Sequence, residues 1–182
     1  MYMKYLEQFE NFDHMNKYYE KKRKFFDSKK SFDDITFDDI PTIVDYIGTD
    51  GYNNEEDAIE DLEEKLTTYK NLSNPVKLYR VVGVKDESEI DKDKLGEHFT
   101  PFLWAIDDDM MRSIGDELWD DDEKPYIIEV LAPLSEIDIW QTIVQNMSFP
   151  REYEINLKNK GKGAKFIRAY SFCDEFDTHT HF

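Results

Sequence analysis

Two glutamates lie one residue apart in the stretch EYEINL, at Glu152 and Glu154. If this stretch is a strand, alternation places both carboxylates on one face together with Asn156. In a preorganised site, such a pair can stabilise a positive charge in a transition state and accept a proton. Glu87 and Glu89 repeat the spacing in a stretch that we predict to be a loop. The pair alone is therefore also compatible with solvated acids on an edge strand.

Two other segments place polar residues in apolar surroundings. Arg80 lies in the middle of the apolar run KLYRVV, where an arginine needs an anionic partner, either structural or bound. The stretch GEHFTPFLWA turns at Gly96 and predicts a strand that ends at Thr100, followed by a helix-compatible run. We interpret His98 in this stretch as a hydrogen-bonding residue at the rim of a pocket rather than as a catalyst.

The elements that must position these residues follow from periodicity. Aromatic and aliphatic residues recur every three or four positions over residues 2–26, which predicts one or two helices. The same spacing predicts a helix over 54–70 and another within 101–118. Beyond residue 75 short β-rich runs follow, so we expect an α+β fold with a helical N-terminal region packed on a mainly antiparallel β-core. The runs are VKLYRVVGV, YIIEVLAPL, IDIW, EYEINL and AKFIRAYSF.

Two short segments carry turn signals. The repeat SFDDITFDDI predicts a loop and a helix start, with Asp39 or Thr42 near the cap and Pro41 in the first turn. The stretch KNKGKGAK lacks the strand–loop–helix context of a phosphate-binding loop, and we predict a hairpin there.

Composition limits the possible partners and the compartment. The chain has 182 residues, with 41 Asp and Glu against 23 Lys and Arg, for a net charge of −18. This charge disfavours direct binding to nucleic acid or to an anionic membrane and favours a basic protein surface. A single cysteine, Cys173, and the absence of a signal-like or membrane-spanning run predict a cytoplasmic protein. His179 and His181 near the end of the chain are expected to be part of a frayed tail, not a metal site.

The order of these motifs resembles the arginine-serine-glutamate class of mono-ADP-ribosyltransferases. A strand with a central arginine is followed by a strand with a hydroxyl and then by a Glu-x-Glu strand, over about residues 54–172. The similarity is concentrated in KLYRVV, LGEHFTPFLWA and FPREYEINLKNKGKGAKF. It implies the split β-core of that family in residues 54–182 and a helical extension over residues 1–53. The chain is most similar to compact members encoded by bacteriophages.

The resemblance also implies roles for individual residues. Arg80 would hold NAD, and Thr100 would supply the hydroxyl of the family's Ser-Thr-Ser strand, although here it lies between Phe99 and Pro101. Glu154 corresponds to the catalytic glutamate, and Glu152 to the upstream acid of enzymes that modify arginine. The implied NAD pocket also includes His98, Tyr79 and Phe99.

The stretch WQTIVQNMSFPR precedes the glutamate pair, and we predict a loop there. In the family the equivalent loop faces the protein acceptor, so the resemblance implies that this stretch selects the substrate. The expected reaction transfers ADP-ribose from NAD to an acceptor protein of the host, on an arginine, and releases nicotinamide. The candidate substrate-recognition residues are Gln145, Phe149 and Arg151.

Two alternative functions follow from the same sequence. The acidic runs at 107–109 and 120–122 are typical of a non-catalytic inhibitor that mimics nucleic acid and blocks a DNA- or RNA-binding protein. The altered Phe-Thr-Pro motif also leaves open a transferase fold that binds without catalysing.

Overall fold

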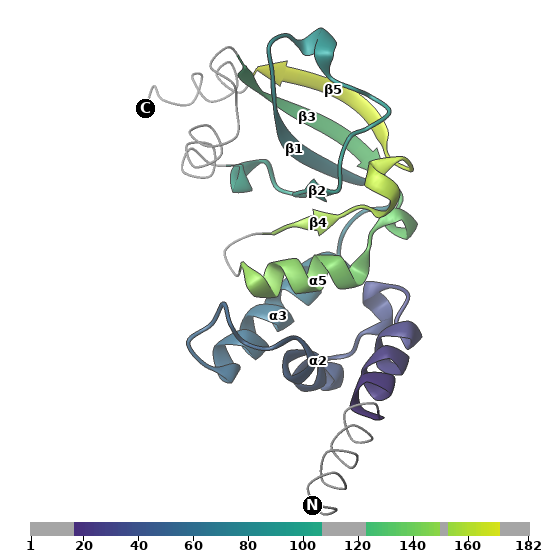
Figure 1. Cartoon of the computed structure of the whole chain (residues 1–182), viewed down its shortest axis with the longest axis vertical. Coiled ribbons are helices and arrows are strands. Elements are labelled where there is room, and N and C mark those ends of the chain that lie inside the picture. Colours follow the sequence, from purple (N-terminus) through teal and green to yellow (C-terminus); the bar gives the residue numbers. More distant parts are fainter. Residues whose placement is uncertain (1–16, 107–122, 150–152, 172–182) are drawn as a thin grey trace, which may run out of the picture.

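The computed structural model describes residues 17–106, 123–149 and 153–171, and it has an α+β fold. Figure 1 shows a three-stranded sheet at one end of the molecule and helices at the other. A two-stranded sheet and helix α5 (Ile139–Ser148) lie between them. The predicted fold class is therefore confirmed at the level of helices and antiparallel strands.

The larger sheet contains the three longest β-rich runs of the sequence. Strands β1 (Val76–Val84), β3 (Lys124–Ala132) and β5 (Lys165–Ser171) pair antiparallel in the order β1-β3-β5. The smaller sheet pairs β2 (His98–Phe99) antiparallel with β4 (Ile155–Asn156). A bridge between Tyr79 and Thr100 connects the two sheets through two backbone hydrogen bonds of 2.8 Å. As predicted, the strand that contains His98 leads to Thr100.

The central strand β3 carries one buried acid. The side chain of Glu129 is only 5% exposed, and it accepts hydrogen bonds from Arg168 on β5 and forms an ion pair with Lys77 on β1. Burial raises the pKa of this carboxyl, but the hydrogen bonds and charges of the two cations outweigh burial and lower the pKa below its usual value. Glu129 thus links all three strands through ion pairs.

The helical end begins with a helical stretch over residues 17–28, followed by α2 (Ile40–Ile47) and α3 (Glu55–Lys70). Helix α3 confirms the predicted helix over 54–70. The Asn54 side chain caps it by accepting a hydrogen bond from the Asp57 amide at 2.8 Å. The first turn is acidic, as the helix dipole favours.

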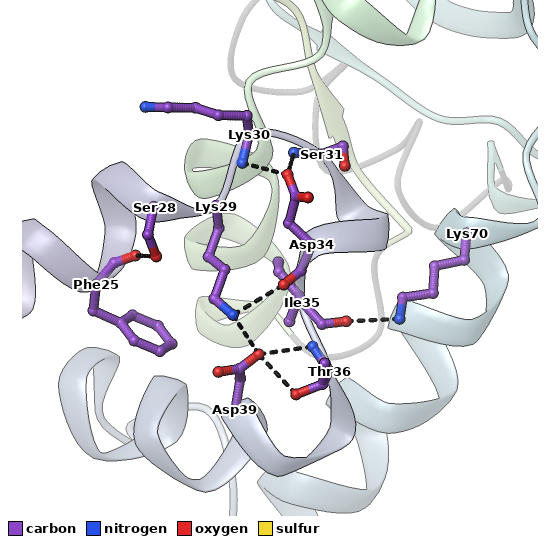
Figure 2. A network of polar contacts seen from close by, with 10 residues as sticks. All are labelled: Phe25, Ser28, Lys29, Lys30, Ser31, Asp34, Ile35, Thr36, Asp39 and Lys70. Atoms are coloured by element: carbon purple, nitrogen blue, oxygen red, sulfur yellow. Dashed lines mark hydrogen bonds and ion pairs between the residues drawn. The ribbon is translucent and has the colours of Figure 1, made fainter.

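The repeat SFDDITFDDI forms two successive capped turns, which Figure 2 shows. Asp34 accepts hydrogen bonds from the backbone of Lys30 and Ser31, and Asp39 accepts from the backbone and hydroxyl of Thr36, each at 2.8 Å. Lys29 joins the turns by donating to the Asp34 carbonyl and the Asp39 carboxylate. As predicted, Asp39 lies at the start of a helix with a proline in its first turn.

One hydrophobic core extends from the helices to the sheets. It contains Phe32 and Ile35 of the capped turns, Leu66 of α3, Leu78 of β1 and Ile143 of α5. The predicted boundary at residue 53 therefore does not separate two cores, although the division remains a prediction. A second, small cluster around Ile106 and Ile127 covers the opposite face of β1 and β3. In the part of the chain that the structure describes, no helix combines the length and apolar character needed to cross a bilayer.

Two local predictions are wrong, and two others are met only in part within the described residues. Residues 139–148, expected as a strand end and a loop, form helix α5, because Ile139, Ile143 and Met147 repeat every four residues and face the core. The stretch KNKGKGAK is not a hairpin, because strands β4 and β5 on either side of it belong to different sheets. EYEINL pairs as a strand only at Ile155–Asn156 within the described residues. The helix expected within 101–118 shows one 3-10 turn, Leu103–Ala105, and then passes into residues 107–118, outside the described chain.

We predict that Asp39→Asn lowers the free energy of unfolding by about 1–2 kcal/mol, because the charge that pairs with Lys29 is lost. Burial raises the pKa of Asp39, but its bonds to Lys29 and Thr36 bring the pKa below the usual 3.8. A carboxyl with a depressed pKa stabilises the fold above its unfolded pKa, and this contribution is lost as the pH falls through the folded pKa. The difference between wild type and variant should therefore shrink below pH 3.8.

Urea unfolding at about pH 7 and about pH 3 measures both effects. Asp38→Asn is the matched control, since it removes the same charge from an exposed neighbour and should change stability by less than about 0.5 kcal/mol. Equal losses in the two variants would show that the capped turn does not depend on Asp39.

Candidate functional site

The carboxylate of Glu154 lies at the centre of a polar cluster on the smaller sheet. Its Oε1 atom is 2.5 Å from Nδ1 of His98 and accepts a hydrogen bond of 2.7 Å from Nδ2 of Asn156. The antiparallel register brings these partners together, because His98 on β2 pairs with Asn156 on β4. The Glu154 side chain is 12% exposed and that of His98 is 54% exposed. The carboxylate is thus fixed by two partners and remains partly exposed.

Arg80 approaches the same cluster from β1. It is half-buried, and its Nη1 donates to the Leu95 carbonyl at 3.2 Å. Burial lowers the pKa of the guanidinium, while the charges of Glu154 and Glu97 oppose that shift. An arginine keeps its charge under these conditions. Arg80 thus brings a cation close enough to Glu154 for their charges to interact.

Gly96 makes room for this guanidinium. A Cβ atom at Gly96 would lie only 1.4 Å from Nη1 of Arg80, and the residue has a φ of +91° that side chains rarely adopt. Gly161, with a φ of +73°, packs in turn against Gly96, where a Cβ would lie 2.7 Å from the Gly96 carbonyl oxygen. The two glycines therefore allow the turn before β2 and the turn after β4 to close around Arg80.

The backbone of Glu154 is held by helix α5 instead of a strand. The amide of Asn146 accepts a hydrogen bond from the Glu154 N–H at 3.0 Å and donates one to the Glu154 carbonyl at 2.7 Å. One turn earlier, the Thr142 hydroxyl accepts from the Asn156 N–H at 3.0 Å. Both helix residues are fully buried. Thr142 and Asn146 are four positions apart and lie on one face of the helix. Glu154 and Asn156 are two positions apart and lie on one side of an extended chain. The helix can therefore contact both residues of the extended chain at once.

Aromatic rings surround the residue before Glu154. Tyr153 contacts the rings of Phe102 and Trp104 edge-to-face, and these two stack on each other at 5.3 Å. The Tyr153 hydroxyl donates to Glu64 at 2.7 Å, and this bond together with burial raises the Tyr153 pKa to about 12. Trp104 is 65% exposed, so the cluster continues to the surface.

The other predicted NAD-binding residues lie in different places. Thr100 is half-buried and its hydroxyl accepts a hydrogen bond from the Phe102 amide at 3.3 Å. The Phe99 ring is 3% exposed and packs in the main core. The Tyr79 ring packs with Ile127 on the face of the sheet with the second cluster. Of the proposed set, the structure brings together Arg80, His98 and Glu154.

Two of the three predicted substrate-recognition residues, Gln145 and Phe149, lie at the end of α5. Gln145 lies in the last turn and its carbonyl accepts a hydrogen bond from the Phe149 amide at 2.9 Å. Phe149 follows the helix and is 52% exposed. Arg151 and the second glutamate, Glu152, lie outside the described residues.

Sequence reasoning missed four residues of this site. Asn146 and Thr142 were hidden in a stretch interpreted as a loop, yet polar residues four positions apart inside an apolar helix face are a signal that could have revealed them. Lys65 lies on the buried face of α3 and donates to the Asn146 carbonyl at 3.2 Å. No feature of the sequence indicates that Gly96 contacts Arg80.

The side chains of this arrangement can act electrostatically on a bound molecule. Within the described residues, no group of three or more His, Cys, Asp or Glu is placed to hold a metal ion. A fixed carboxylate can stabilise a cationic transition state, and a nearby guanidinium can bind an anionic group such as a phosphate. The site therefore suits a substrate with both a phosphate and a carbon centre that becomes positively charged.

Comparisons with known proteins add no further assignment. No protein-family model, curated protein or solved structure matches the chain.

We predict that Gly96→Ala displaces the Arg80 guanidinium from the Leu95 carbonyl, because the new methyl group would occupy its position. Stability should fall by about 1–3 kcal/mol, the cost of a backbone conformation that only glycine adopts easily. Gly48→Ala is the matched control, with a φ of +99° and nothing within 4 Å of its Cβ. The side-chain NMR signals of Arg80 should shift in the first variant and stay in place in the second. An unshifted Arg80 in Gly96→Ala would contradict this packing.

Proposed function

We propose that this protein is an NAD-dependent mono-ADP-ribosyltransferase that transfers ADP-ribose to an arginine of an acceptor protein. The observation that carries the proposal is that one short segment contacts both residues: the Arg80 guanidinium packs at Gly96, and His98, two residues later, contacts the Glu154 carboxylate. A half-buried guanidinium offers a planar fork of donors for a pyrophosphate. A carboxylate held on its backbone and on its side chain offers a fixed negative charge beside a ribose.

The reaction would break one bond and form another at C1′ of the ribose. The bond between the ribose C1′ and the nicotinamide nitrogen breaks, and its electron pair leaves with nicotinamide. The ribose becomes oxocarbenium-like, and Glu154 stabilises its positive charge. A guanidino nitrogen of the acceptor then bonds to C1′, and its proton passes to a base, the role that we assign to Glu152.

The neighbours of Glu154 support this role through its orientation. His98 and Asn156 both contact the Oε1 atom, so the carboxylate has a fixed direction. The other oxygen, Oε2, is then available to accept a hydrogen bond from a ribose hydroxyl. A preorganised acceptor of this kind does not have to reorient as charge develops, which is the main source of electrostatic catalysis.

The partners follow from the charge and the resemblance. A chain with a net charge of −18 attracts a basic protein surface, as expected of an acceptor that presents arginine. We place the reaction in the cytoplasm of a host cell, as for the phage-encoded enzymes that the chain resembles. The competing hypothesis is the acidic inhibitor that mimics nucleic acid, and it rests on the same net charge.

We predict that Glu154→Gln lowers nicotinamide release from NAD by about 100- to 1,000-fold, with little change in KM, because the lost charge acts mainly in the transition state. Glu60→Gln removes the same charge from an exposed position on α3 and should leave the rate unchanged. The assay incubates purified protein with labelled NAD and a host lysate. No nicotinamide release from folded wild type would reject the transferase and favour the acidic inhibitor, for which both variants would bind the target equally.

We predict that Glu152→Gln keeps NAD hydrolysis and loses transfer to arginine. A protonated guanidinium must lose a proton to a base before it can attack the ribose, whereas water depends less on that base. The variant should therefore lose transfer to arginine and keep hydrolysis. Nicotinamide release and label incorporation into a small guanidine acceptor, measured in parallel, show the split. A variant that loses both activities equally would assign Glu152 to the ribosyl cation instead of the acceptor.

A further inference from the structure

The ammonium group of Lys65 is buried beside the candidate site and has no role in the proposed reaction. Its side chain on α3 is 1% exposed. The Nζ atom forms an ion pair with Asp61 at 3.0 Å and donates to the Asn146 carbonyl at 3.2 Å. It also lies 5.7 Å from the centroid of the Tyr153 ring. Burying a lysine is costly, so these contacts must compensate for the lost hydration.

The contact with Asn146 lies at the end of α5. This helix ends at Ser148, so the carbonyl of Asn146 is one of the last four, which have no partner within the helix. A cation at the C-terminal end of a helix also interacts favourably with the helix dipole. Lys65 therefore holds the turn of α5 that carries the Asn146 side chain.

The same ammonium reaches the extended chain on the other side. Asn146 holds the N–H and the carbonyl of Glu154, and Tyr153 is the residue before Glu154. Lys65 contacts the Tyr153 ring, while its neighbour Glu64 accepts the hydrogen bond of the Tyr153 hydroxyl. Two successive residues of α3 thus bind both elements that define the position of Glu154.

Asp61 fixes the ammonium in turn. It accepts a hydrogen bond from the Tyr52 hydroxyl in the segment before α3, and it lies one turn before Lys65 on the same helix. The Tyr69 hydroxyl, one turn after Lys65, donates to the Glu154 carbonyl at 3.4 Å. A chain of polar contacts therefore runs from Tyr52 through Asp61, Lys65 and Asn146 to the backbone of Glu154.

We propose that Lys65 is a positioning residue that fixes the Glu154 carboxylate by joining the end of α5 to Tyr153. This inference rests on the proposed function for its effect on catalysis, but the placement of Glu154 can be measured without any substrate. Lys65 touches neither NAD nor the acceptor in this role, and it acts through Asn146 and Tyr153.

The test replaces Lys65 with methionine, which has an unbranched, slightly shorter side chain and no charge. Lys65→Met should increase the amide hydrogen exchange of Glu154 by about tenfold or more, because the bond from its N–H to Asn146 opens more often. The kcat for NAD cleavage should fall by about tenfold or more, with KM for NAD nearly constant, since a misplaced carboxylate affects the transition state most.

Lys70→Met is the matched control. It changes the same residue type on the same helix and removes a hydrogen bond of 2.6 Å to the Ile35 carbonyl, which belongs to the capped turns. It should leave the exchange of Glu154 and the kcat as in wild type. Equal exchange of Glu154 in wild type and Lys65→Met would overturn the inference, as would equal effects of the two variants.

The proposed transferase function and the positioning role of Lys65 can be rejected independently. If wild type does not cleave NAD, the proposed function is rejected, while the exchange of Glu154 still decides the role of Lys65. If Lys65→Met does not fold, Asp61→Asn takes its place, because it keeps the ammonium and weakens its anchor. Faster exchange of Glu154 in that variant supports the inference, and unchanged exchange overturns it.

Discussion

The candidate site depends on one buried side-chain amide, that of Asn146. It gives Glu154 the two backbone hydrogen bonds that a neighbouring strand would otherwise supply. A strand neighbour would extend the sheet past Glu154, whereas a single amide on a helix ends the pairing there. The carboxylate can then turn toward His98 and Asn156 while its backbone stays fixed. A buried amide without partners is costly, so this arrangement is also a constraint on the fold.

The cations and the acids of the chain contribute to the structure in different ways. The chain carries an excess of acids, yet several of its cations contact a carboxylate or a carbonyl, whether the cation is buried, as Lys65 is, or exposed, as Lys77 and Arg168 are. Lys65 pairs with Asp61, Arg168 and Lys77 bind Glu129, and Arg80 lies near Glu154. These cations connect elements, while the excess of acids gives the chain its net negative charge.

Periodicity predicted the elements with a regular apolar pattern. The helix over 54–70 and strands β1, β3 and β5 are confirmed, because their apolar residues repeat with the period of the element that buries them. The prediction failed over 139–148, where Thr142 and Asn146 lie on the buried face and break the apolar pattern. Those two polar residues bind the backbone of Glu154 and Asn156, partners that no local pattern reveals.

The sequence by itself determined the α+β class, the antiparallel pairing type and the candidate acids, since these depend on residue types and local spacing. Only the tertiary structure decided which candidates meet. It joined Arg80, His98 and Glu154 and placed the rings of Phe99 and Tyr79 in core clusters. The physical reason is that the contacts around Glu154 connect residues from four separate elements. Their register depends on packing and on glycine-sized spaces, and neither is encoded in the spacing along the chain.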